Sequence, residues 1–317
     1  MRQTVTWKTI LNQPAGWYKT PEAQKIAKNV LLYQHANGGW EKNLDMLLPP
    51  KTPPKETTID NGATTTQLTF LARVGTPECR TAALKALDFL LAAQYPNGGW
   101  PQFFPLKKGY YTHITFNDDA MVHVLTVLRE LAQNKPDYAF VDAAQRQKSA
   151  QAVTKGIACI LKCQVVQGGK KTVWCAQHDE VTFAPAKARA YELPSLSGSE
   201  SVDILRFLMG EKPTPALVEA IEGGVAWLKA NAIQGIRIEK QGDDKVVVRD
   251  PSAPPLWARF YDLETGKPFF CGRDGIKKAT LAEIEKERRT GYAWYTNRGE
   301  KLLSDDYPAW KEKRKHP

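Results

Sequence analysis

Two short segments place carboxylate and amide side chains directly before helical patterns. Asp60-Asn61-Gly62 is a turn signal ahead of one such pattern, and Asp118-Asp119 open another. Carboxylates at the start of a helix can cap it and complement its dipole. The same oxygens are the hard ligands that Ca²⁺ prefers. The residues alone favour a helix cap for Asp60, and they leave both capping and metal binding open for Asp118 and Asp119.

Arginines in long loops with aromatic neighbours form a second group of candidates. Arg189 lies in segment 188–195, and Arg259 and Arg273 flank an insert that looks like a turn between two extended segments. Arginines in such loops often bind carboxylates through a bidentate fork. A surface ion pair with a nearby Asp or Glu is the competing interpretation, and the sequence does not decide between the two.

The net charge of +10 narrows the class of ligand. Such an excess serves solubility or attracts a polyanion, which would be a nucleic acid or an acidic polysaccharide. The chain has no zinc-finger, helix-turn-helix or RNP signature, so we expect no nucleic-acid partner. No apolar run approaches the roughly 18 residues that span a bilayer, so we expect no membrane association. The first seven residues also lack the apolar core of a signal peptide.

A repeat of sixty residues organises the first third of the chain. Gln34–Trp40 (QHANGGW) recurs as Gln94–Trp100 (QYPNGGW), and residues 164–169 look like a degraded third copy. Each copy follows a helical pattern, and glycine ends a helix because it adopts positive φ without steric cost. The tryptophans are expected to lock one helix end onto the next. A sugar-binding groove lined by Trp40 or Trp100 is the alternative.

Apolar periodicity and repeat length together predict the fold class. Two helices in each repeat of about sixty residues suggest helical hairpins arranged in a ring. The strand signal is thin, with one small hairpin expected from residues 236–238 and 245–249. Long polar loops are expected to carry function. Further helices are predicted at residues 118–132, 144–163, 200–209 and 215–230.

The five cysteines are too sparse for a fold stabilised by many disulfides. Cys159 and Cys163 stand four residues apart, on one face of a helix, and Cys175 follows them. We expect one disulfide together with buried thiols, in preference to a metal site built from these three.

Six segments considered jointly resemble polysaccharide lyase family 10, from about residue 20 to residue 310. No single segment is specific, but the combination is. The segments are 37–43 (NGGWEKN), 58–64 (TIDNGAT), 95–102 (YPNGGWPQ), 116–121 (FNDDAM), 188–192 (ARAYE) and 256–275.

The resemblance implies a mainly α fold with an irregular (α/α)3 toroid-like barrel, long functional loops and a few short strands. It implies one catalytic domain over residues 1–317, and we expect a monomer. The implied activity is that of a secreted pectate lyase, extracellular or periplasmic. Such an enzyme binds polygalacturonate with Ca²⁺ and cleaves it by β-elimination.

The resemblance also assigns roles to particular residues. The catalytic base of the family is an arginine, which matches Arg189. Asp60 and Asn61 match the pair that contacts substrate and calcium. Asp118 or Asp119 matches the main calcium ligand, and the sequence does not say which of the two.

The substrate-binding arginines of the family match Arg259 and Arg273, and Lys42 and Tyr261 in the matching segments are further candidates for substrate binding. A guanidinium normally stays charged, so an arginine base needs an unusual environment. We expect Ca²⁺ and the two other arginines to lower the pKa of Arg189, because packed positive charges disfavour one another. Activity should then rise steeply at alkaline pH.

Two other functions compete with the lyase. The first is a uronan hydrolase on an α/α barrel, in which Asp118 would act with Asp60 or Glu192 as acid and base. The second is a non-catalytic polysaccharide-binding protein derived from a lyase. Loss of Arg189 or of the Asp118-Asp119 pair would favour the second, but the chain retains them.

Overall fold

The computed structural model describes residues 5–53 and 55–315. The chain divides into two compact units, Met1–Ala158 (unit 1) and Cys159–Pro317 (unit 2), and the division falls inside helix α5 (Ala143–Cys163). Among the described residues, no helix has both the length and the apolar character that crossing a membrane requires.

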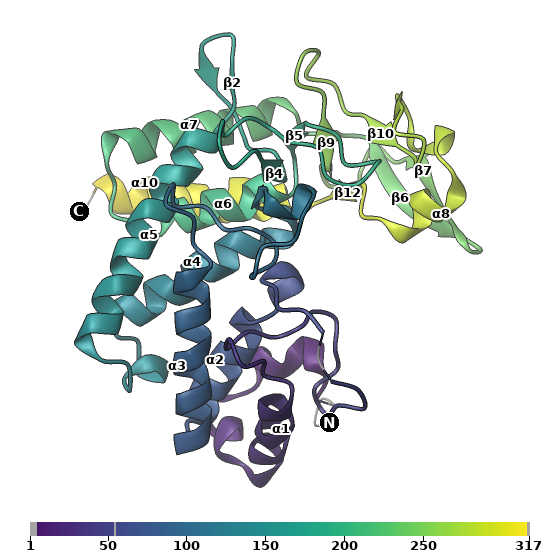
Figure 1. Cartoon of the computed structure of the whole chain (residues 1–317). Coiled ribbons are helices and arrows are strands. Elements are labelled where there is room, and N and C mark those ends of the chain that lie inside the picture. Colours follow the sequence, from purple (N-terminus) through teal and green to yellow (C-terminus); the bar gives the residue numbers. More distant parts are fainter. Residues whose placement is uncertain (1–4, 54, 316–317) are drawn as a thin grey trace. The chain divides into compact units, whose positions relative to one another are not determined.

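Unit 1 consists of helices joined by long loops, and its α2 packs against α1, α3 and α4 (Figure 1). Short 3-10 helices, labelled η, punctuate the loops. The elements of unit 1 before α5 are η1 (Trp7–Asn12), η2 (Ala15–Lys19), α1 (Pro21–Leu32), η3 (Asp60–Gly62), α2 (Thr65–Val74), α3 (Pro77–Ala92), η4 (Tyr110–Thr112), β1 (Ile114–Thr115), η5 (Asn117–Asp119), α4 (Ala120–Ala132) and η6 (Pro136–Tyr138).

Unit 2 combines helices with short antiparallel strand pairs: β2 with β3, β5 with β9, β6 with β7, β8 with β12, and β10 with β11. Its helices after α5 are α6 (Glu200–Met209), α7 (Pro215–Ala230), η7 (Leu281–Glu283), α8 (Lys286–Gly291), α9 (Arg298–Lys301), the π-helical η8 (Leu302–Asp306) and α10 (Tyr307–Lys315). Its strands are β2 (Val166–Gln167), β3 (Lys170–Lys171), β4 (Gln177–His178), β5 (Leu196–Ser197), β6 (Ile236–Gln241), β7 (Asp244–Arg249), β8 (Trp257–Ala258), β9 (Phe260–Tyr261), β10 (Phe270–Cys271), β11 (Lys277–Lys278) and β12 (Tyr295–Thr296).

The mainly α-helical class is confirmed, and so are the predicted helices. α4, α5, α6 and α7 begin within two residues of the predicted starts and end at the predicted residues. The expected hairpin is also present, as β6 and β7, and it is longer than the sequence suggested, with Ile236 opposite Arg249 and Gln241 opposite Asp244.

Three helices begin with the same Thr-Pro signal. The hydroxyl oxygens of Thr20, Thr76 and Thr214 each accept a hydrogen bond from the backbone N–H three residues later, at 3.3 Å. The proline that follows has no N–H to leave unsatisfied in the first turn. Local sequence therefore starts α1, α3 and α7.

The tryptophan of each repeat locks the end of a helix, as expected. The indole N–H of Trp40 donates to the carbonyl of Val30 in α1 (2.9 Å), and that of Trp100 donates to Leu90 in α3 (2.8 Å). Both tryptophans are fully buried, which rules out the sugar-binding alternative. The tryptophan of the third copy lies beyond the predicted segment: Trp174 donates to Ile160 in α5 (2.8 Å) after the β2–β3 hairpin.

The glutamine of each repeat binds both its own repeat segment and a helix further along the chain. The Gln34 amide donates to the carbonyls of Gly38 (3.0 Å) and of Ala82 in α3 (2.9 Å). The amides of the glutamines in the other two copies make the equivalent pairs of bonds. They are Gln94 to Gly98 and Ala152, and Gln164 to Thr172 and Ala220. Each copy therefore connects the helix that precedes it with a later helix, which is α3 for the first copy, α5 for the second and α7 for the third.

All five cysteines are free, buried thiols, so the expected disulfide is wrong. Cys159 and Cys163 lie one helical turn apart in α5, and the proximity of the Cys159 thiol together with burial raises the pKa of Cys163 far above its usual value. Among the described residues, no cysteine belongs to a group with metal-binding geometry.

Gly98 in the second repeat provides a test of how closely that repeat packs against α5. It has φ +95°, and a Cβ there would lie 2.1 Å from the carbonyl oxygen of Lys155. Gly109 has the same φ but nothing within 4 Å of its Cβ position. We expect Gly109→Ala to destabilise the fold by about 1–3 kcal/mol through backbone strain, and Gly98→Ala to cost about 2 kcal/mol more because the backbone must shift. Urea unfolding of both variants measures the difference, and equal losses would contradict the close approach.

Candidate active site

The acidic turns of unit 1 share an unusual backbone conformation. Asn61 and Asp118 have φ of 51° and 50°, and Asp119 has φ of 60°. Asn and Asp tolerate this left-handed region better than other side chains. The two turns that contain them, η3 and η5, pack against each other. The structure thus brings together two acidic segments that are 57 residues apart in the sequence.

The two turns are equivalent positions of the repeat. The backbone N–H of Thr58 donates to the carbonyl of Trp40, and that of Thr115 donates to the carbonyl of Trp100, both at 3.1 Å. Asn61 stands three residues after Thr58, and Asp118 stands three residues after Thr115, so the two residues correspond. The sequence does not show this alignment directly, because the stretch from Trp40 to Thr58 is longer than the stretch from Trp100 to Thr115.

Asp60 is buried and held by side chains from both repeats. Its Oδ2 pairs with the Lys42 ammonium and accepts a bond from Gln102 Nε2 (2.6 Å), and its Oδ1 accepts the Asn61 N–H (3.1 Å). Lys42 and Gln102 each stand two residues after a lock tryptophan. The helix-cap interpretation of Asp60 is therefore not what the structure shows. Gln102 was missed, and its repeat position is the signal that would have found it.

Asp118 and Asp119 are half-buried at the start of α4. Asp118 Oδ2 accepts a bond from Asn117 Nδ2 (2.7 Å), and Asp119 is the N-cap residue but its side chain makes no capping bond. Capping is thus not the role of Asp119 in this structure. Carboxylate and amide oxygens on two packed turns are a donor set that fits Ca²⁺. The Lys42 ammonium on Asp60 is the positive charge with which a cation there would compete.

Arg189 of unit 2 forms a fork with Glu192. The guanidinium Nε donates to Oε2 (2.7 Å) and Nη2 donates to Oε1 (2.5 Å). The Arg189 side chain is 42% exposed and the Glu192 side chain only 3%. The rings of Tyr191 and Tyr292 lie 5.1 and 5.7 Å from the guanidinium carbon. The arginine is therefore held on one edge and accessible from outside.

The pKa of Arg189 is shifted in the direction opposite to that expected. Burial alone would lower it, but the hydrogen bonds and charge of Glu192 outweigh burial and raise the pKa above its ordinary value. The expectation that neighbouring arginines lower it omitted this glutamate. Glu192 in turn has a lowered pKa: burial would raise it, but the bonds from Arg189 and Tyr292 dominate.

Arg259 and Arg189 both contact the ring of Tyr292. Its guanidinium carbon is 4.6 Å from the centroid of Tyr292, and its Nη2 donates to Glu200 Oε1 (2.5 Å). Only 7% of the Arg259 side chain is exposed. This burial limits any direct contact with a substrate, so the residue chiefly supports the Tyr292 ring.

Arg273 is exposed and forms a fork with Glu287, with Nε and Nη2 at 3.1 and 3.0 Å from the two carboxylate oxygens. Glu287 also binds Arg288, whose guanidinium lies 4.8 Å from the Tyr191 ring. Each predicted arginine thus has a glutamate partner, but only the pair of Arg273 is the fully exposed surface pair that the competing interpretation anticipated, because the pair of Arg259 is buried. The same contacts also connect Arg273, through Arg288, to the tyrosines beside Arg189.

Tyr261 lies in the core. Its hydroxyl donates to the carbonyl of Asn231 (2.9 Å) and accepts the N–H of Ala258 (3.1 Å), while its ring packs edge-on against Trp227. The side chain is 1% exposed. The structure therefore gives Tyr261 a packing role and leaves no surface for the substrate contact that the sequence suggested.

A family model described as pectic acid lyase matches residues 34–303. A family 10 polysaccharide lyase from Cellvibrio cellulosa has a similar structure, with 40% identity and a TM-score of 0.87 over 93% of this chain and 95% of that one. An aspartate-to-alanine mutant of a family 10 polysaccharide lyase from Cellvibrio cellulosa, in complex with trigalacturonic acid, shares 40% identity with a TM-score of 0.86 over 96% and 99%. A comparison with curated proteins found no match.

The chain belongs to the pectic acid lyase family. The expected (α/α)3 fold class is thereby confirmed, since family 10 lyases have it and the helix–lock–helix unit recurs along this chain. The family match covers the acidic turns of unit 1 and the arginines of unit 2 alike.

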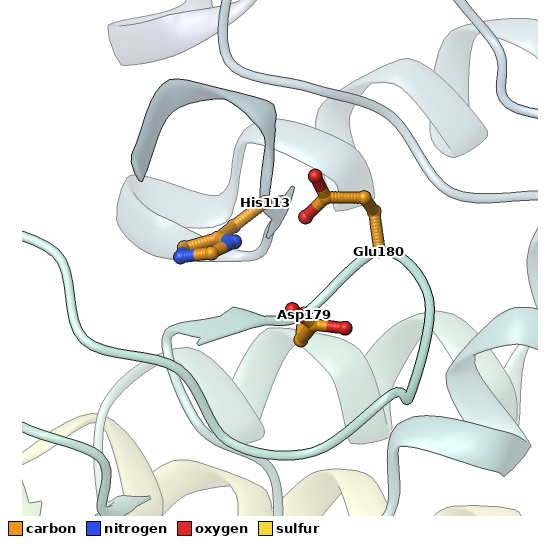
Figure 2. A group of neighbouring side chains, drawn as sticks. All are labelled: His113, Asp179 and Glu180. Atoms are coloured by element: carbon orange, nitrogen blue, oxygen red, sulfur yellow. The ribbon is translucent and has the colours of Figure 1, made fainter. Parts of the chain in front are cut away.

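One acidic turn of this pectic acid lyase family member was not singled out from sequence. Figure 2 labels Asp179 and Glu180, which directly follow β4 in unit 2. Asp179 Oδ1 accepts the backbone N–H groups of Val181 (3.0 Å) and Thr182 (2.7 Å). This pattern closes the turn, which gives Asp179 a structural role.

The ion pairs made by glutamates differ in burial, and this allows a test. Glu200→Ala would leave the buried Arg259 charge without its carboxylate, so we expect a loss of about 3–5 kcal/mol in unfolding free energy. Glu56→Ala is the control on the exposed pair with Lys107 (2.8 Å), where solvent screens the charges and we expect little change. Denaturant unfolding of both variants provides the comparison. Similar stabilities for the two would show that the Glu200–Arg259 pair is not important to the fold.

Proposed function

We propose that this chain is a Ca²⁺-dependent pectate lyase that cleaves α-1,4-polygalacturonate by β-elimination and releases 4,5-unsaturated oligogalacturonates. The main support is a structure of 40% identity over 96% of the chain, which is a family 10 lyase in complex with trigalacturonic acid. The net charge of +10 suits a polyanionic substrate, because attraction speeds the encounter.

The reaction begins at C5 of a galacturonate, where the proton lies α to a carboxylate and is a poor acid. Its removal builds charge on a group that is already anionic. A bound Ca²⁺ would act as a Lewis acid on that carboxylate. In our proposal Asp60, Asp118 and Asp119 hold the ion, because their oxygens lie on two packed turns of unit 1.

The remaining steps fall to residues that contact the substrate. Asn61, Lys42 and Arg273 are partly or fully exposed polar groups, and we assign them to the hydroxyl and carboxylate groups of the sugar. Arg259 supports Tyr292 and contributes positive charge. Arg189 takes the C5 proton in its neutral form. The 4-O-linked sugar then leaves, so no water is consumed and no covalent enzyme intermediate forms.

We further propose that units 1 and 2 work as one catalytic domain and that the protein is a monomer. The family match runs through both units without interruption, from residue 34 to residue 303. A secreted enzyme is consistent with the substrate, because a polymer of this kind lies outside the cell.

Polygalacturonate at alkaline pH provides the first test. With added Ca²⁺ we expect growth of the ultraviolet absorbance of the unsaturated product, and we expect a chelator to abolish it. New reducing ends without that absorbance would instead indicate a hydrolase. Binding of the polymer with neither signal would indicate a non-catalytic binding protein.

Replacing the base provides the second test. Arg189→Lys should lower kcat by about 10²–10⁴-fold, the range that a general base contributes. Arg237→Lys, on the β6–β7 hairpin, is the matched control and should retain wild-type activity, since Arg237 is outside the proposed site and pairs with Glu239. Near-normal turnover by Arg189→Lys would exclude this residue as the base.

A further inference from the structure

The Arg189 guanidinium has two edges with different surroundings. Nε and Nη2 donate to the two carboxylate oxygens of Glu192, and these bonds do not involve Nη1. A carboxylate only accepts hydrogen bonds, so it favours amino nitrogens opposite it and disfavours an imine nitrogen with a lone pair. Nη2 has a second hydrogen that the fork does not use, but its loss would leave an imine nitrogen beside the carboxylate. Loss of a proton from Nη1 keeps both nitrogens of the fork as full donors, so the carboxylate favours the neutral form with its lone pair on Nη1.

Glu192 is itself held firmly. Besides the fork, its Oε2 accepts the backbone N–H of Arg189 (3.1 Å) and its Oε1 accepts the hydroxyl of Tyr292 (2.8 Å). Backbone bonds close the same turn, from the Glu192 N–H to the Arg189 carbonyl (2.9 Å) and from the Ala188 N–H to the Glu192 carbonyl (3.0 Å). A carboxylate that is 3% exposed with four accepted bonds has no freedom to rotate.

The rings beside the guanidinium restrict it further. Tyr191 and Tyr292 contact each other edge-on, with centroids 5.3 Å apart, and both lie within 6 Å of the Arg189 guanidinium carbon. The fork fixes the rotation of the guanidinium in its plane, and the rings oppose tilting of that plane. Of the three guanidinium nitrogens, Nη1 is the one outside the fork, and the side chain as a whole is 42% exposed.

We propose that Glu192 is a positioning residue of the lyase reaction: it holds the Nε and Nη2 edge of Arg189, and thereby makes Nη1 the nitrogen that takes the C5 proton. The inference rests on the proposed function of Arg189 as base. To that function it adds which nitrogen of Arg189 takes the proton, Nη1, and which residue determines this, Glu192.

The arrangement has a consequence for pH dependence. The charged and titratable groups that face Arg189 are Glu192, Tyr191 and Tyr292, with Arg288 beyond the Tyr191 ring and Arg259 beside Tyr292. Among them the Glu192 carboxylate provides the main stabilisation of the guanidinium charge, and it raises the pKa of Arg189. Removing that charge lowers this pKa, so the neutral, active form becomes available at lower pH.

Glu192→Gln keeps the shape of the side chain but removes its charge, and its amide can accept at only one of the two positions. We expect kcat to fall about 10–10²-fold from lost orientation, KM to stay unchanged, and the alkaline rise of kcat to move to lower pH. Asp244→Asn is the matched control: Asp244 forms the same fork to Nε (2.8 Å) and Nη2 (2.5 Å) of Arg289. It should leave kcat and its pH profile unchanged.

Glu192→Asp separates orientation from charge and guards against misfolding of the glutamine variant. It keeps the carboxylate but is too short for the full fork, so we expect a lower kcat with the alkaline rise at its wild-type pH. Wild-type kcat and pH profile in Glu192→Gln, with Arg189→Lys inactive, would overturn the inference and leave the lyase intact. Absence of elimination by the wild-type protein would instead overturn the proposed function and the inference with it.

Discussion

The structure depends on side-chain bonds that satisfy the carbonyl groups at helix ends. The last four carbonyls of an α-helix have no partner within the helix, and a buried end must find one elsewhere. Here the indole N–H of a following tryptophan supplies it, at Val30 of α1, Leu90 of α3 and Ile160 of α5. A glutamine amide makes two more bonds at each place. The lock therefore stabilises each helix end and fixes where the chain goes next.

The locks also determine where the acidic turns lie. The carbonyl of each lock tryptophan accepts a backbone N–H that stands shortly before the next helix, at Thr58, Thr115 and Ser197. In the first two copies, the residues that follow form the left-handed turns of Asn61 and Asp118. The third copy does not form such a turn: the corresponding residue, three positions after Ser197, is Glu200, which already lies in α6. Two of the three copies thus carry the geometry that suits a cation, and the difference arises from a few residues on a shared scaffold.

Much of this could be predicted from sequence, because the signals are local. Helical periodicity and the Thr-Pro starts need no tertiary information, and the resemblance assigned roles to Asp60, Asp118 and Arg189. Contacts between distant segments could not be predicted in the same way. The burial of Tyr261 depends on Asn231 and Trp227, and the third lock was hidden because a hairpin separates Gln164 from Trp174. Thiol packing gives no pattern along the chain, so the disulfide prediction had little to rest on.

The Glu192 fork has opposing effects on a base. It raises the pKa of Arg189, which makes less of the neutral form available at a given pH but makes that form a stronger base. Catalysis by a general base follows Brønsted behaviour, in which rate rises less steeply than basicity. Below the pKa, the loss of neutral form therefore exceeds the gain in strength, and the fork by itself slows proton abstraction. In the reaction that we propose, its benefit is then geometric: it directs one nitrogen toward the substrate, in a plane fixed by a buried carboxylate and two tyrosine rings.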